Sequence, residues 1–145
     1  MTYDYVIVGG GSAGSTLAAR LSEDPNTSVC LLEAGGMAKG LLHRLPTGAL
    51  VMLPGRPKIS NWAYQTVPQP GLNGRRGYQP RGKMLGGSSG LNAMLYVRGH
   101  RSDYDGWADL GCDGWGWDDV LPYFKTSENN ARGADDFHGG DGPLH

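Results

Sequence analysis

The chain has 145 residues, with 13 Lys and Arg against 14 Asp and Glu and a formal net charge of −1. This length suffices for one domain with a hydrophobic core, and the balanced charge argues against nucleic acid as a partner. No stretch predicts a membrane-spanning helix, and the first residues lack the features of a secretory signal peptide. Cys30 and Cys112 have neither metal-ligand nor redox-motif spacing. We therefore expect no metal site and a cytoplasmic protein, with peripheral membrane association left open.

Residues 1–36 carry the pattern of a strand, a glycine loop, a helix and a second strand. The run from Tyr5 to Val8 is short, apolar and rich in β-branched residues, which is typical of a parallel strand buried on both faces. Apolar residues at helical spacing follow, and Pro25 ends the helix. The run from Val29 to Leu32 forms the second apolar strand. This order predicts a βαβ unit.

The loop between the first strand and the helix has the spacing Gly9-x-Gly11-x-x-Gly14. Gly9 permits a tight turn, Gly11 lets the backbone approach a pyrophosphate, and Gly14 allows the helix to pack closely on the strand. The N–H groups of the first helical turn, with Ser12 and Ala13, then face the phosphates. The loop therefore predicts a dinucleotide site.

Glu33 ends the second strand, nineteen residues after Gly14. A carboxylate at this position accepts hydrogen bonds from both hydroxyls of an adenosine ribose. It would repel a 2′-phosphate, and no Arg occurs in the next ten residues, which argues against NADP. The βαβ unit alone does not separate FAD from NAD.

Residues 37–81 show no strong periodicity and are punctuated by prolines, which predicts an extended loop that covers or wraps a site. Pro57 is one of these prolines. Within the loop, Trp62 and Tyr64 offer flat apolar surface, either against a cofactor ring or as ordinary loop anchors.

Residues 82–99 contain a second glycine loop, in which Gly86 and Gly87 precede two serines. Its backbone N–H groups could bind phosphate or the edge of a flavin. Ser88 or Ser89 is a plausible N-cap for a short helix over 92–96.

This second loop resembles the first signature of the glucose–methanol–choline (GMC) oxidoreductases, most closely in their bacterial choline and alcohol dehydrogenase branch. The matching positions are Gly82, Gly86, Gly87, Ser88, Ser89, Asn92, Tyr96, Gly99 and Asp105. The resemblance covers nearly the whole chain and implies FAD-dependent oxidation of the CH–OH group of an alcohol, with hydride transfer to flavin N5. A hydroxynitrile-lyase-type enzyme on the same fold and a non-catalytic nucleotide-binding fragment stay open. An NAD dehydrogenase is a weaker alternative, because 86–92 would have no role in it.

The resemblance also implies which residues contact the cofactor. Some members attach FAD covalently through a histidine just before the signature asparagine. Leu91 occupies that place here, so we expect noncovalent FAD. The expected contacts are Gly9, Gly11, Ser12, Ala13, Gly14, Glu33, Ala34, Trp62, Arg81, Leu85, Gly86, Gly87, Ser88, Asn92, Ala93, Met94 and Leu95.

No catalytic residue is assigned, because the family places its catalytic histidine near its far C-terminus. His43, His100, His138 and His145 are instead interpreted as solvated histidines. We expect a further polypeptide to carry the substrate domain and the catalytic histidine.

Residues 100–128 predict a helical segment, with a small core of Trp107, Val120, Leu121 and Phe124, and 129–145 predict an irregular tail. The expected fold is α/β: a partial Rossmann-like FAD-binding fold with a long wrapping loop and short helices. Two strands are a fraction of a doubly wound sheet, so we expect this fold to be incomplete alone.

Overall fold

The computed structural model describes residues 2–54 and 58–145, so Pro57 lies outside the described residues. The chain forms two compact units, unit 1 (Met1–Leu95) and unit 2 (Tyr96–His145), and each is described by itself. None of the helices within the described ranges is long and apolar enough to cross a membrane.

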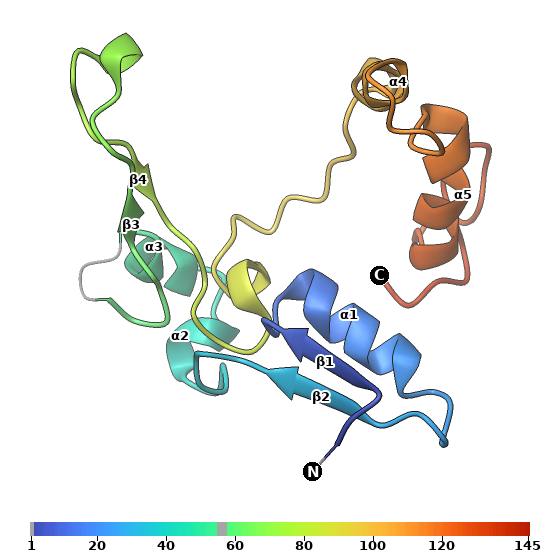
Figure 1. Cartoon of the computed structure of the whole chain (residues 1–145), viewed down its shortest axis with the longest axis horizontal. Coiled ribbons are helices and arrows are strands. Elements are labelled where there is room, and N and C mark those ends of the chain that lie inside the picture. Colours follow the sequence, from blue (N-terminus) through green and yellow to red (C-terminus); the bar gives the residue numbers. More distant parts are fainter. Residues whose placement is uncertain (1, 55–57) are drawn as a thin grey trace. The chain divides into compact units, whose positions relative to one another are not determined.

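Unit 1 opens with the βαβ order that the sequence predicts. Strands β1 (Tyr5–Val8) and β2 (Val29–Leu32) form a parallel pair whose register begins with Tyr5 opposite Val29. Helix α1 (Ser12–Leu21) connects them and contacts both strands (Figure 1). The expected α/β fold class, with its strand–glycine loop–helix–strand unit, is thereby confirmed.

The two strands are less buried than their composition predicts. Val6 is 56% exposed, Val8 83% and Leu32 50%. A parallel strand is buried on both faces only when helices and neighbouring strands cover it. Within the described residues each of these strands has a single neighbour. The strands therefore lack the burial on both faces that is typical of a parallel sheet, in agreement with the expectation of an incomplete fold.

The segment 37–81 is more ordered than the extended loop that its prolines predict. Its described residues form two short helices, the antiparallel hairpin β3–β4 and one 3₁₀ turn (Figure 1). Elements of two to five residues are too short to produce a periodic pattern, which is why the sequence did not reveal them. The elements are α2 (Leu41–Arg44), α3 (Gly48–Met52), β3 (Tyr64–Gln65), η1 (Pro70–Leu72) and β4 (Tyr78–Gln79).

The short helix predicted over 92–96 is absent from the structure. The serines lie inside a single 3₁₀ turn, η2 (Gly87–Gly90), and residues 93–100 have no regular structure. The Asn92 side chain accepts a hydrogen bond of 2.9 Å from the Met94 N–H, and Met94 has a left-handed φ of 57°. This local turn gives the backbone of 92–94 a hydrogen bond that is incompatible with a helix, so no helix forms there.

The core of unit 1 is small and lies beneath the second glycine loop. Met52, Met84 and Leu91 are almost fully buried, and Ala38 and Leu42 pack against them. The core therefore joins the α2–α3 segment to the chain around η2.

Unit 2 contains helices α4 (Arg101–Asp109) and α5 (Trp117–Ser127) within the predicted helical segment. His100 and Asp103 form a reciprocal capping box at the start of α4. Asp105 accepts a hydrogen bond of 2.9 Å from the backbone N–H of residue 117, so a side chain of one helix caps the other.

The core of unit 2 is centred on Tyr104, which the sequence analysis did not name. Tyr104 is 8% exposed, and its ring lies 5.3 Å from Trp107, 5.5 Å from Trp117 and 5.8 Å from Phe124. Trp107, predicted as a core residue, is 46% exposed. Aromatic contacts, of which those to Trp107 and Phe124 are edge-to-face, stabilise this core.

The tail 129–145 is tied to the end of α5 by a buried carboxylate and by backbone hydrogen bonds, such as that from the Leu144 N–H to the Ser127 carbonyl. The Glu128 side chain is 8% exposed and forms an ion pair of 2.5 Å with Arg98. It also accepts hydrogen bonds from the Asn130 amide, the His138 ring and the Gly139 N–H. The tail is therefore irregular in secondary structure but anchored.

We expect the stability of unit 2 to decrease in acid because of this carboxylate. Burial raises the pKa of the Glu128 carboxyl, but its hydrogen bonds and the Arg98 guanidinium lower this pKa by more, so it lies below its ordinary value. A carboxyl whose pKa is lowered by folding stabilises the folded state at pH values above its unfolded pKa of about 4.3. This stabilisation is lost as the pH falls through the pKa of the folded state. Thermal unfolding of the native protein and of Glu128→Gln between neutral and acid pH measures it. Equal pH dependence of the two proteins would contradict the assignment.

Candidate cofactor site

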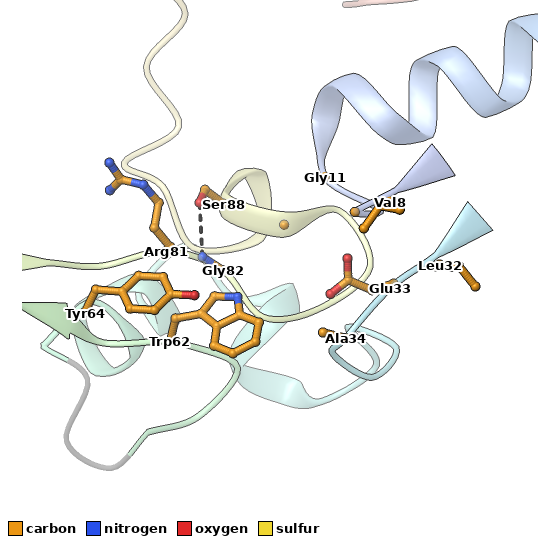
Figure 2. Close-up of a pocket in the computed structure, with 12 residues that line it drawn as sticks. Val8, Gly11, Leu32, Glu33, Ala34, Trp62, Tyr64, Arg81, Gly82 and Ser88 are labelled. Atoms are coloured by element: carbon orange, nitrogen blue, oxygen red, sulfur yellow. Dashed lines mark hydrogen bonds between the residues drawn. The ribbon is translucent and has the colours of Figure 1, made fainter. Parts of the chain in front are cut away.

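Unit 1 contains a cleft of about 660 Å³ at the carboxyl ends of β1 and β2 (Figure 2). In open α/β folds this edge of the sheet is where ligands bind. Its lining comes from the first glycine loop, the end of β2, the hairpin and the second glycine loop. The lining residues are Val8, Gly9, Gly11, Leu32, Glu33, Ala34, Trp62, Tyr64, Arg81, Gly82, Gly87 and Ser88.

The three glycines of the first loop have different surroundings. Gly9 has a left-handed φ of 101°, and its N–H donates a hydrogen bond of 2.7 Å to the Leu32 carbonyl, so the chain turns sharply there. A Cβ on Gly14 would lie 1.9 Å from the Gly9 carbonyl oxygen, which confirms that this glycine permits close helix–strand packing. A Cβ on Gly11 would have only Gly87 Cα nearby, at 3.9 Å. The space beside Gly11 is therefore open toward the cleft rather than filled by protein.

Glu33 is held at the rim of the cleft by two backbone amides. Its Oε2 accepts a hydrogen bond of 2.7 Å from the Gly10 N–H, and its Oε1 accepts one of 2.7 Å from the Gly35 N–H. Each carboxylate oxygen has about two acceptor positions. One position on each oxygen remains for a further donor, which fits the paired hydroxyls of a ribose.

The second glycine loop lies directly beside the first. The Gly86 N–H donates 2.7 Å to the Gly10 carbonyl, and a Cβ on Gly87 would lie 2.8 Å from Gly11 Cα. Ser88 Oγ accepts 3.0 Å from the Gly82 N–H, which fixes the turn (Figure 2). Two glycine loops thus meet at one wall of the cleft, and the Gly86 and Gly87 N–H groups, which the sequence analysis offered to a ligand, donate within the protein to Gly10 and Met84.

Trp62 and Tyr64 form the aromatic side of the cleft (Figure 2). Their rings are stacked, with centroids 5.6 Å apart and planes 9° apart, and Lys83 Nζ lies 4.3 Å from the Trp62 ring centroid. These contacts fix the Trp62 ring at the cleft.

Asn61 holds this aromatic side in place and is only 4% exposed. Its Oδ1 accepts from two backbone N–H groups, and its Nδ2 donates to two carbonyls and one hydroxyl. Those partners are Ala63 N (2.9 Å), Arg81 N (3.1 Å), Met52 O (2.8 Å), Leu53 O (3.4 Å) and Tyr78 Oη (3.1 Å).

The structure brings together eight of the residues expected to contact the cofactor: Gly9, Gly11, Glu33, Ala34, Trp62, Arg81, Gly87 and Ser88. The other expected residues do not line the cleft, and residues 92–95 are exposed. These others are Ser12, Ala13, Gly14, Leu85, Gly86, Asn92, Ala93, Met94 and Leu95. Val8, Leu32, Tyr64 and Gly82 line the cleft without having been selected. Val8 and Leu32 could have been predicted from the sequence, because they end the two strands and ligands bind at the carboxyl ends of parallel strands.

All four histidines interpreted as solvated form hydrogen bonds, and two of them, His43 and His138, are only partly exposed. His43 lies on α2, with Nε2 2.9 Å from Ser60 Oγ, and its Nδ1 is buried. His138 Nδ1 lies 3.0 Å from the Glu128 carboxylate. Neither lines the cleft, so neither is assigned chemistry there.

The sequence model of the GMC oxidoreductases matches residues 3–145. The chain belongs to the GMC oxidoreductase family. It is 50% identical, over 100% of its length, to an oxygen-dependent choline dehydrogenase of Rhizobium etli (strain CIAT 652), and 50% identical, over 99%, to one of Escherichia coli (strain ATCC 8739). Members of this family bind FAD.

Solved structures agree with this assignment. Pyridoxine 4-oxidase from "Mesorbium loti" superposes with a TM-score of 0.89 at 46% identity, over 99% of this chain and 28% of its own. Formate oxidase superposes with a TM-score of 0.78 at 36% identity, over 97% and 26%. The chain also spans 26% of each choline dehydrogenase named above, about a quarter of these relatives.

Proposed function

We propose that this chain is the FAD-binding portion of a flavin-dependent oxidoreductase acting on the CH–OH group of an alcohol. The observation that carries the proposal is the meeting of two glycine loops beside a fixed carboxylate in one cleft. Relatives named for choline, pyridoxine and aryl alcohols support an alcohol as substrate.

Within this proposal each part of the cleft binds one part of FAD. Gly11 and the first turn of α1 hold the pyrophosphate, because the N–H groups of a helix N-terminus and the open space at Gly11 suit an anion. The Gly9 and Gly10 N–H groups instead donate within the protein. Glu33 binds the adenosine ribose, and residues 86–88 lie along the cofactor, with 92–95 near the isoalloxazine. When bound, FAD supplies the acceptor for the hydride that leaves the alcohol carbon.

We assign no proton-transfer residue to the described part of the chain. The base that takes the hydroxyl proton belongs, in this proposal, to a further polypeptide that also forms the substrate pocket. The relatives are about four times as long as this chain, which leaves room for such a domain.

The direct test is anaerobic addition of alcohols to the purified native protein. We expect a flavin spectrum that bleaches with a primary alcohol. Cleavage of a cyanohydrin without bleaching would instead support a lyase. A native protein without flavin would refute the proposal.

Glu33→Gln is expected to weaken FAD binding about tenfold or more, because a charge-assisted hydrogen bond contributes about 1.5–3 kcal/mol. Glu23→Gln is the matched control, since Glu23 is an exposed carboxylate paired only with Arg20. Titration of the flavin-free protein with FAD measures both dissociation constants. Equal constants for the two variants would remove Glu33 from the site.

We further propose that FAD is held noncovalently. Leu91 has no nucleophile and is 3% exposed, packed with Met52 and Met84 in the core. Acid precipitation of the native protein should therefore release all flavin absorbance into the supernatant. Flavin colour that stays with the precipitate would contradict this proposal.

A further inference from the structure

The net charge of −1 hides a strong separation of charge along the chain. Residues 34–102 hold ten of the 13 Lys and Arg and none of the 14 Asp and Glu. Unit 1 has nine basic residues against four acidic ones, a net charge of +5, whereas unit 2 has four against ten, a net charge of −6. The unit that contains the cleft is therefore the basic one.

Four basic side chains of unit 1 form what we call the basic rim: Arg75, Arg76, Arg81 and Lys83. Arg81 lines the cleft, and Lys83 lies over Trp62, which also lines it. Arg75 and Arg76 are exposed near the end of the β3–β4 hairpin. In the described part of the chain, none of the four forms an ion pair.

The cleft itself offers little positive charge for a diphosphate. Its lining contains one cationic side chain, Arg81, and one carboxylate, Glu33, so these two nearly cancel. A diphosphate ester is dianionic at neutral pH, and a field of one sign around a cleft attracts such a ligand before contact.

We propose that the basic rim recruits FAD electrostatically, and that the two hairpin arginines raise the rate of capture without touching the cofactor. This inference rests on the proposed function. It deepens that proposal by giving the hairpin a part in cofactor loading.

The geometry of the hairpin supports action through the field rather than contact. Tyr64 lines the cleft and pairs with Gln79, and Arg75 lies four positions before Gln79 in the sequence. At about 3.3 Å per residue for an extended chain, this is at most roughly 13 Å. That distance is comparable with the Debye length of about 10 Å at 0.1 M salt. The attraction should therefore be visible at low salt and screened at high salt.

The test uses the native protein in which this chain occurs, stripped of flavin, and follows FAD binding by stopped-flow fluorescence. Arg75→Gln/Arg76→Gln removes the hairpin charge, and Lys125→Gln/Arg132→Gln removes two charges from unit 2 as the control. We expect the hairpin variant to bind FAD about three- to tenfold more slowly at low salt. At about 1 M salt its rate should equal that of the native protein. The dissociation rate should be unchanged, and the control should behave as native.

A second variant guards against a folding defect, because Arg75 Nε donates 3.1 Å to the Leu72 carbonyl. Arg75→Lys/Arg76→Lys keeps the charge but not this bond and should restore the native association rate. Native-like association by the Gln variant at low salt, or a change confined to dissociation, would overturn the inference. A native protein that takes up no FAD would overturn the proposed function as well, so the two failures are distinguishable.

Discussion

Gly14→Ala should destabilise the βαβ unit by about 1–3 kcal/mol or more and strip the native protein of FAD. The added methyl group would lie 1.9 Å from the Gly9 carbonyl oxygen and 3.4 Å from Ile7 Cγ2. Backbone atoms cannot move aside as a flexible side chain can. Either α1 lifts off the sheet or the turn at Gly9 opens, and both changes displace the pyrophosphate loop. Chemical unfolding and flavin content measure the two effects.

The sign of this effect is diagnostic, because glycine to alanine normally stabilises a helix by about 0.5–1 kcal/mol. Gly106→Ala is the matched control, since Gly106 lies inside α4 with nothing within 4 Å of an added Cβ. We expect that variant to be at least as stable as the native protein. A stabilising Gly14→Ala would show that the helix does not pack on the strand as described.

Gly11→Ala separates cofactor binding from folding. Its methyl group would come no closer than 3.9 Å to a protein atom outside the adjacent residues, so the fold should be retained. The same methyl group would occupy space that a pyrophosphate needs. We therefore expect Gly11→Ala to have the unfolding free energy of the native protein but to bind FAD weakly. A packing defect, as in Gly14→Ala, would instead lower the unfolding free energy as well.

The βαβ unit was predictable because its signals are local. A strand, a loop and a helix each leave a pattern within about ten residues, and Gly9, Gly14 and Glu33 fall at fixed offsets within that order. The burial of the strands was not predictable in the same way. Val8 is 83% exposed. Burial depends on the elements that cover a strand, and the composition of the strand does not show whether those elements are present.

The site was predictable in part for the same reason. The residues found at the cleft come from motifs with a fixed backbone geometry, such as Gly87 beside Gly11. Residues 92–95 were placed along the cofactor by resemblance, yet they are exposed in this chain. Arg98 and Glu128, thirty residues apart, left no local signal because their ion pair is a tertiary contact.

Asn61 is a residue whose structural role becomes clear from the fold. Its amide joins α3, the hairpin and the chain at Arg81 by hydrogen bonds of 2.8–3.4 Å. No sequence pattern distinguishes such a buried amide from an exposed one, because its partners are mostly backbone groups brought together by tertiary structure.

Asn61→Ala should therefore destabilise unit 1 by about 3–5 kcal/mol and weaken FAD binding at least tenfold. Truncation leaves several buried donors and acceptors unpaired, at about 1–3 kcal/mol for each group that water cannot reach. Trp62 and Arg81 then lose the contact that sets them at the cleft. Unfolding free energy and the FAD dissociation constant of the native protein measure the two consequences.

Asn26→Ala is the control, since the Asn26 side chain bonds only the exposed Asp24. Such a surface change should shift the unfolding free energy by no more than about 0.5 kcal/mol. Asn61→Asp is more informative, because it keeps the acceptor for the Ala63 and Arg81 amides but replaces the donor with a buried charge. If the donor to Met52 and Leu53 matters, Asn61→Asp should be as unstable as Asn61→Ala. A stable Asn61→Asp that binds FAD normally would show that Asn61 acts only as an acceptor.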